Sequence, residues 1–326
     1  MEQHHGDLRV FAYRMLGSLL EAERLVEQTF SLATLQLRTL DATDFVRTLL
    51  YRILAKRCLG VLEGQSWRTL PFLSHPSADL LEPPTTSSDS VWIEPFPDEL
   101  YPEATYEGVS AYGAREMISL PFIAALQFIP PPERAVIVLR DTMGRKLDEV
   151  ADVLGVSSSE VDGMLGQARS VMARHYRAEL GRREPPAAPS ATALLMQYLY
   201  PWETGNLDGL MSRLTGEVIL QVPPSPSWYK GSAAVRLYLA SRAFGSGARG
   251  RWRLLPRRAN GQFAFGTYER DDTGLEYLAH SIQVLTFEEG LVSEIIWFAN
   301  RLLFPAFKLR SRVIVQGRMA PRDERE

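Results

Sequence analysis

The 326-residue sequence has few residues of the kinds that build metal and redox sites, with one cysteine and five histidines. A single thiol, Cys58, excludes an internal disulfide and leaves no cysteine cluster for zinc. We therefore expect no metal and no cofactor, and a reducing, cytoplasmic location. Cys58 lies in an apolar helical pattern, which favours a buried structural thiol over a nucleophile.

Long apolar runs and a large excess of charge are also missing. No run is long enough to cross a bilayer, and the N-terminus lacks the basic and apolar regions of a secretory signal. A net charge of -3 excludes a polycation that coats nucleic acid. With 45% hydrophobic and 23% charged residues, the chain has the composition of a soluble globular protein of two or three domains, with no membrane partner.

Charge and proline divide the chain into modules. Residues 71–114 contain eight acidic residues and no Lys or Arg, and their prolines favour an extended linker over a packed domain. A second break falls at GRREPPAAPS, residues 181–190. The sequence predicts modules at 1–70, 115–183 and 190–310, the linker at 71–114 and a polar tail at 311–326.

The stretch 147–174 has the pattern of a helix-turn-helix. Gly155 suits the left-handed residue that ends a first helix, and Ser157 or Ser158 can cap the second. Apolar residues at helical spacing then leave one polar face outward. In DNA-binding proteins this face enters the major groove. An ordinary helical hairpin has the same local pattern, so it stays open as an alternative.

A second candidate for DNA contact is the basic helix predicted after Asp41 or Thr43, which are capping candidates. Its cations can follow a phosphate backbone or a single strand, and Tyr51 can stack on a base. A solvated charged face on a helical bundle explains the same residues. The cations are Arg47, Arg52, Lys56 and Arg57.

The third module has the mixed pattern of an α+β domain. A helix is expected at 191–214, then a strand at 217–222, a helix at 231–243 and four strands at 251–259, 262–270, 276–289 and 291–301. Long antiparallel strands with alternating burial curl around a helix.

Three segments together resemble the bacterial sigma-70 family, extracytoplasmic-function group. Residues 13–30, YRMLGSLLEAERLVEQTF, are similar to the region that docks on the clamp helices of RNA polymerase. Residues 45–60, FVRTLLYRILAKRCLG, are similar to the helix that reads and opens the minus-10 element. Residues 125–169, from ALQFIPPPERAVIVLRD through the helix-turn-helix, are similar to the region that binds the minus-35 element.

The linker and the third module extend the resemblance. SVWIEPFPDEL, residues 90–100, is similar to a phrase of a subgroup with a C-terminal SnoaL-like, polyketide-cyclase-like domain, and QVPPSPSWYKGSAAVRLYL, residues 221–239, and LLFPAF, residues 302–307, are similar to that domain. The resemblance implies a multidomain chain with two all-α sigma-factor domains, a helical bundle and a helix-turn-helix, and an α+β cone. It also implies that the cone regulates the first two modules.

The resemblance implies core RNA polymerase and promoter DNA as partners and supplies candidate contacts. The DNA-binding candidates are Ser157, Ser158, Ser159, Asp162, Gly163, Gln167 and Arg169 in the helix-turn-helix, and Tyr51, Arg52, Lys56 and Arg57 in the basic helix. Further phosphate contacts are expected from Arg134, Arg140, Arg145 and Lys146. The polymerase-binding candidates are Leu25, Val26, Gln28 and Phe30.

Several positions depart from the family pattern. Arg24 stands where the family usually has an acid, and Leu49 where a tryptophan is usual. Asn, Ser and Arg are common where Asp162, Gly163 and Gln167 stand. Asp162 would repel a phosphate, and a glycine inside a helix costs about 1 kcal/mol relative to alanine. These departures favour an alternative function, a degenerate sigma-like regulator that does not open promoters.

The cone offers a candidate pocket for a small-molecule ligand, because mostly apolar pockets with a few polar groups are typical ligand sites. Aromatic residues that simply fill the core explain the same pattern. No carboxylate pair or His–Asp spacing demands catalysis, so a cyclase-like enzyme is a further alternative and we expect no catalytic residue. The pocket candidates are Trp202, Trp228, Tyr229, Tyr268, His280 and Trp297.

Overall fold

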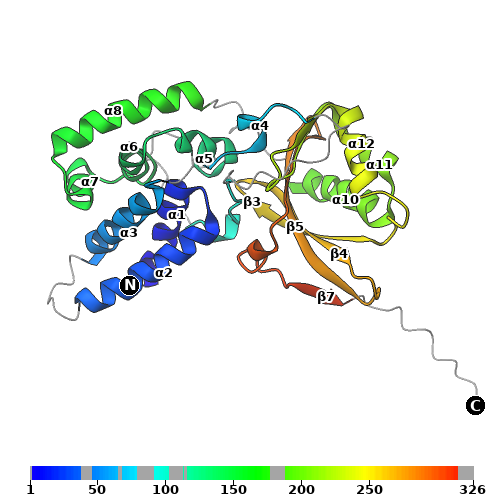
Figure 1. Ribbon diagram of the computed structural model, residues 1–326, viewed down its shortest axis with the longest axis horizontal. Helices are drawn as coiled ribbons and strands as arrows, with labels where there is room; N and C mark the ends of the chain where they lie inside the picture. The colour runs from blue at the N-terminus through cyan, green and yellow to red at the C-terminus, as the bar shows by residue number, and fades with distance from the viewer. Residues whose placement is uncertain are drawn as a thin grey trace, which may run out of the picture.

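The computed structural model describes residues 2–37, 46–64, 68–78, 92–102, 113, 116–176 and 188–314. Helices form one lobe, and a sheet with three covering helices forms the other (Figure 1). The capping candidates Asp41 and Thr43, most of the acidic linker and the tail after residue 314 lie outside the described residues.

The N-terminal bundle consists of three helices after a short 3-10 turn, η1 (Glu2–His4). Gly17 ends the first helix in the left-handed conformation, with φ of 66°, which glycine adopts without a Cβ penalty. Apolar residues such as Leu8, Phe11 and Met15 then face the other two helices and are fully buried. The helices are α1 (His5–Leu16), α2 (Leu19–Leu37) and α3 (Val46–Leu62).

The second group of helices follows the linker. Ser119 caps its first helix by accepting a hydrogen bond from Phe122 N. Its apolar residues join those of the N-terminal bundle in one continuous core, so the two expected helical modules are packed together. The elements are η3 (Glu116–Ile118), α5 (Leu120–Gln127), α6 (Pro131–Ile137), the π-helical η4 (Val138–Thr142), α7 (Leu147–Leu154) and α8 (Ser158–His175).

The sheet of the C-terminal domain runs in the order β2-β1-β6-β5-β4-β3, with β7 paired to β5. β1 and β6 are parallel and the other pairs are antiparallel. The long strands match the expected ones closely, while β2 and β7 are additional. The strands are β1 (Leu214–Gln221), β2 (Trp228–Lys230), β3 (Trp252–Ala259), β4 (Gln262–Arg270), β5 (Glu276–Glu288), β6 (Leu291–Phe298) and β7 (Arg312–Ile314).

The two faces of the sheet serve different cores. One face packs under α10 (Ala188–Thr204), α11 (Leu207–Met211) and α12 (Ser232–Arg242). Side chains of the other face, such as Ile282 and Val284, belong to the core of the helical lobe. The expected α+β domain is confirmed, and its sheet lies between the helical lobe and α10, α11 and α12 (Figure 1).

The linker differs from the expectation of a solvated, extended segment. Its described parts contain α4 (Pro71–Ser74) and η2 (Asp98–Leu100). Ile93 and Phe96 are fully buried between the lobes. The apolar residues between the prolines of these described parts have packing partners in both lobes.

Candidate nucleic-acid interface

The helix-turn-helix is formed by α7 and α8. Gly155 ends α7 with φ of 71°, as its position predicts. Ser157 caps α8, where its hydroxyl accepts a hydrogen bond from Glu160 N at 3.3 Å. The Glu160 carboxylate in turn accepts from Ser157 N at 2.8 Å and Ser157 Oγ at 2.7 Å, which completes a capping box. These bonds lower the pKa of Glu160.

The outer face of α8 is free of packing, as expected for a helix that meets a partner. Its apolar residues, Val161, Leu165, Ala168 and Met172, are the buried ones. Arg169 differs from the expectation of a DNA contact, because its Nε and Nη2 each bind the Asp141 carboxylate at 2.8 Å. The exposed candidates are Ser157, Ser158, Ser159, Asp162, Gly163 and Gln167.

The basic helix α3 contains four cations and no acid. Arg52 and Lys56 lie one turn apart and are exposed, while Arg57 is half-buried beside Gln28. Tyr51, expected to stack on a base, is 2% exposed in this closed arrangement and packs edge-on against Phe11. Burial raises the pKa of Tyr51 to about 12.

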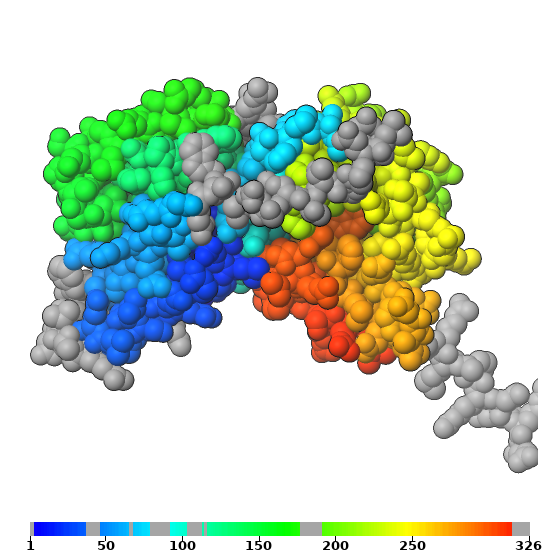
Figure 2. Space-filling view, viewed as in Figure 1, coloured from blue at the N-terminus to red at the C-terminus, as the bar shows by residue number. Residues whose placement is uncertain are grey.

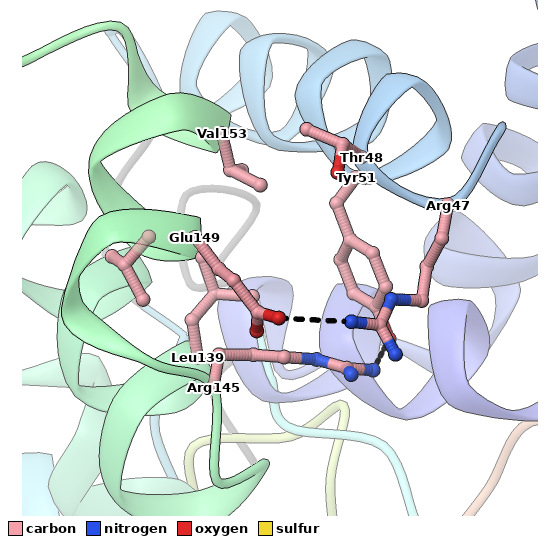
Figure 3. A pocket seen from close by; sticks show the side chains of 8 residues that line it. Arg47, Thr48, Tyr51, Leu139, Arg145, Glu149 and Val153 are labelled. Carbon is pink, nitrogen blue, oxygen red and sulfur yellow. Dashed lines mark hydrogen bonds and ion pairs between the residues drawn. The ribbon is translucent and has the colours of Figure 1, made fainter. Parts of the chain in front are cut away.

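The first helix of the helix-turn-helix, α7, packs beside α3 (Figure 3). Arg47 binds the Glu149 carboxylate at 3.1 Å, and the Arg145 guanidinium lies 5.1 Å from the centre of the Tyr51 ring. Arg52 donates from Nε and Nη2 to the Asp152 carbonyl at 3.2 and 2.9 Å. Arg47, Tyr51, Arg145 and Glu149 are among the side chains that line a shallow hollow open to solvent.

Two buried arginines join the N-terminal bundle to the second group of helices. Arg134 donates to the carbonyls of Met15 and Ile129 and to Gln127, so its expected role as a phosphate contact is wrong. Burial lowers the pKa of Arg134 to about 10. Arg14 reaches across from α1 to the Thr142 hydroxyl at 3.0 Å. Neither arginine is exposed by more than 1%.

The polymerase candidates on α2 divide by burial. Leu25 and Val26 are buried in the core, at 1% and 0% exposure, so their expected contact with polymerase is wrong. Gln28 is half-buried, and Phe30 stacks on His5 at 5.5 Å. The exposed face of the same helix carries Arg24, Glu27, Ser31, Leu32 and Leu35.

Comparisons with known proteins agree with this geometry. The family description "Sigma-70, region 4" matches residues 119–172. The ECF RNA polymerase sigma factor SigG of Mycobacterium tuberculosis is 35% identical over 309 residues, which are 94% of this chain and 82% of SigG.

The chain belongs to the ECF RNA polymerase sigma factors. It is a sigma factor with a C-terminal SnoaL-like domain, and residues 116–176 are called region 4 below.

A solved sigma factor is similar in fold over nearly the whole chain. The crystal structure of the M. tuberculosis extracytoplasmic function sigma factor SigJ aligns with 95% of this chain and 98% of its own, at 22% identity and a TM-score of 0.57. A SnoaL-like protein of Burkholderia thailandensis aligns with 36% of this chain and 99% of its own, at 14% identity and a TM-score of 0.29.

The β3–β4 turn fastens the C-terminal domain of this sigma factor to both helical parts. Asn260, with φ of 52°, is 1% exposed. Its Oδ1 accepts from Phe96 N at 2.7 Å, and its Nδ2 donates to the Tyr13 hydroxyl at 3.1 Å and to the Ile118 carbonyl at 2.8 Å. Sequence reasoning missed this residue. The Asn-Gly pair at 260–261 signals a hairpin turn, but it does not signal what the turn contacts.

The same hairpin also holds the linker by charge. Asp98 accepts a hydrogen bond from Gly261 N at 2.8 Å and pairs with Arg258 at 3.1 Å. At the other end of the sheet, Trp92 Nε1 donates to the Pro224 carbonyl at 2.7 Å. Two separate turns of the SnoaL-like domain therefore bind the segment that joins the bundle to region 4.

The candidate ligand residues do not form one pocket. Trp202, Trp297 and His280 share a cluster with Trp252 under α10, with ring centres 5.2 to 5.9 Å apart. Tyr229 packs on Tyr238 of α12 instead.

Two other candidates lie away from the interior of the cone. Trp228 faces the linker, where it packs on Phe72 and donates to the His75 carbonyl. Tyr268 lies on the opposite face of the sheet, against Phe304. The expected six-residue pocket is therefore wrong. Burial lowers the pKa of His280, which lies between Trp252 and Trp297.

Two further searches cover the described residues alone. No group of three or more His, Cys, Asp or Glu side chains in them could hold a metal ion. None of the described helices combines the length and apolar character needed to cross a membrane.

Proposed function

We propose that this sigma factor binds core RNA polymerase and directs it to promoters, and that its SnoaL-like domain controls this activity by holding the chain closed. Membership of the ECF family supports the first part. The contacts between Asn260 and both helical parts support the second, and they are the single observation on which the regulatory proposal depends.

The polymerase contact is assigned to the exposed face of α2. Arg24, Glu27, Ser31 and Leu35 follow one another at helical spacing, and Leu35 is 62% exposed. A large apolar side chain beside charged ones is typical of a protein contact. Gln28 and Phe30 lie at the margin of this face.

The closed arrangement engages cations that strand binding would use. Helix α7 binds Arg47 and Arg52 at the surface, so both guanidiniums exchange these partners for DNA when region 4 moves away from α3. Region 4 is tied to the bundle by Arg14 and Arg134, and both parts are tied to the cone by Asn260. A signal that weakens the cone's contacts shifts the population toward the open, promoter-binding form.

Run-off transcription with core polymerase and a promoter library tests the proposal. Asn260→Gly keeps the positive φ and removes the three side-chain bonds, so we expect severalfold more transcript than from the unaltered chain. Asn206→Gly is the matched control, because Asn206 caps α11 by bonding only Gly209 N. Equal transcript from both variants would contradict the regulatory role. No transcript from any of them, despite polymerase binding, would favour the degenerate regulator.

A ligand in the cone is a second candidate role, favoured by two buried polar atoms. Gln283 Nε2 and Thr267 Oγ1 lack hydrogen-bond partners among the described residues, and both residues are 0% exposed. A buried donor without a partner costs about 1–3 kcal/mol, which a carbonyl-bearing guest would recover. Tryptophan fluorescence titrated with a hydrophobic ketone tests this, with Gln283→Leu as the variant expected to lose the response.

A further inference from the structure

The two helices expected to meet promoter DNA differ in charge. Helix α3 carries Arg47, Arg52, Lys56 and Arg57 without any acid. The first eleven residues of α8, 158–168, contain Glu160 and Asp162 and no Lys or Arg. Duplex DNA carries about one negative charge per 1.7 Å of helix axis. The exposed part of α8 that would enter a groove therefore repels DNA, while α3 attracts it.

The start of α8 is also occupied. The N-terminal amides of a helix usually form a ready site for a phosphate. Here the Glu160 carboxylate accepts from both the backbone and the hydroxyl of Ser157. A phosphate approaching this end would meet a carboxylate that these bonds keep ionised.

Other cations of region 4 are engaged within the chain. Arg134 is buried among carbonyls, and Arg145 lies over Tyr51. Arg169 holds the Asp141 carboxylate, which is 4% exposed, with two hydrogen bonds. These guanidiniums organise region 4 and its contact with the bundle.

The closed arrangement engages only one of the two helices. Helix α7 binds Arg47 and Arg52 of α3, and both side chains keep exposed surface. The outer face of α8 stays exposed at the edge of the helical lobe, shown in green in Figure 2. The closed form therefore holds two cations of α3 in hydrogen bonds and leaves the outer face of α8 without such contacts.

We propose that this sigma factor selects promoters through the minus-10 element, with Arg52 and Lys56 as strand-binding residues, and that α8 adds no favourable contact to the minus-35 element. Region 4 acts in this chain by holding Arg47 and Arg52 of α3 in the closed form. The inference rests on the proposed function, because it presupposes transcription directed by the chain.

Transcription from a library randomised at both elements tests the inference. The holoenzyme contains the full-length chain with Asn260→Gly, which favours the open form. The templates that it transcribes are then sequenced. We expect one mismatch at minus-10 to lower the transcript yield about tenfold. One mismatch at minus-35 should lower the yield less than about twofold. Comparable preference at both elements would overturn the inference and leave the proposed function intact. Absence of all transcripts would overturn both.

A gain-of-contact variant sharpens this test. Asp162→Asn combined with Gln167→Arg, in the same background, removes the exposed acid and adds a cation to the outer face of α8. We expect a new minus-35 preference of about tenfold for this variant. The control is Asp272→Lys, which makes the same charge change of two units at an exposed turn of the C-terminal domain. If the double variant instead weakened a minus-35 preference already present, α8 would be a reader and the inference would be wrong.

Discussion

Helices α3 and α8 differ in charge and in their contacts with the rest of the molecule. Helix α3 has the cations that DNA binding needs, and the closed chain holds two of them in hydrogen bonds to α7. Helix α8 has the fold and the exposed face of a recognition helix, but no cation in its first eleven residues. The difference teaches that a helix-turn-helix marks where DNA can dock, whereas the charge on its outer face decides whether docking is favourable.

Charge reversal on α3 is expected to give the largest effect. Replacing Arg52 and Lys56 together by Glu should lower run-off transcript on the order of 100-fold, because two phosphate attractions become repulsions. The measurement is transcript yield at equal polymerase occupancy.

The matched control for this reversal lies on α8. Arg174→Glu changes an exposed cation near the end of that helix and should alter the yield by less than about twofold. Equal losses of transcript from the α3 and α8 variants would contradict the proposed difference in DNA binding between the two helices.

Removal of Arg169 should affect stability and leave DNA binding unchanged. Arg169→Met deprives the buried Asp141 carboxylate of two hydrogen bonds, and we expect a loss of roughly 2 kcal/mol in unfolding free energy. This figure is discounted for screening, because the Arg169 side chain is 53% exposed. Denaturant unfolding measures the loss. A fall in promoter affinity of the folded protein, with stability unchanged, would return Arg169 to the set of DNA contacts.

Filling Gly163 tests whether DNA approaches α8 closely. A Cβ at Gly163 meets no atom within 4 Å, so Gly163→Ala should raise stability by about 1 kcal/mol. Promoter choice should stay the same, because no base edge lies against this position. Gly155→Ala is the contrasting variant, expected to destabilise because its φ is +71°. A changed promoter preference in Gly163→Ala would indicate close contact.

Loosening the contact between α7 and α3 should give the smallest effect. Glu149→Gln keeps the cap of α7 and removes the charge that holds Arg47. Both side chains are about two-fifths exposed, so we expect about a twofold gain in DNA binding. Glu160→Gln has the same capping position in α8 without a partner on α3, and it should not loosen this contact. A gain from both variants would point to overall charge as the cause.

Local patterns predicted much of the fold. The helix-turn-helix could be predicted from Gly155, Ser157 and the spacing of the buried residues. Each of these signals depends only on residues within about one helical turn. The long strands of the cone followed from alternation, while β2 and β7, of three residues each, are too short to carry a pattern.

The contacts between modules could not be predicted in the same way. Tyr51, Arg134 and Asn260 have partners 94 to 247 positions away, and no local pattern identifies such partners. Leu25 and Val26 were misassigned because the resemblance locates the helix that meets polymerase but not the face it presents.

The salt dependence of promoter binding tests the central claim most directly. Affinity of the holoenzyme for one selected promoter is measured over a range of salt concentrations for three proteins, the unaltered chain, Lys56→Ala and Arg174→Ala. The account predicts that the slope of log affinity against log salt falls by roughly 0.7–0.9 for Lys56→Ala and is unchanged for Arg174→Ala. The account would be contradicted if the slope fell for Arg174→Ala and stayed unchanged for Lys56→Ala.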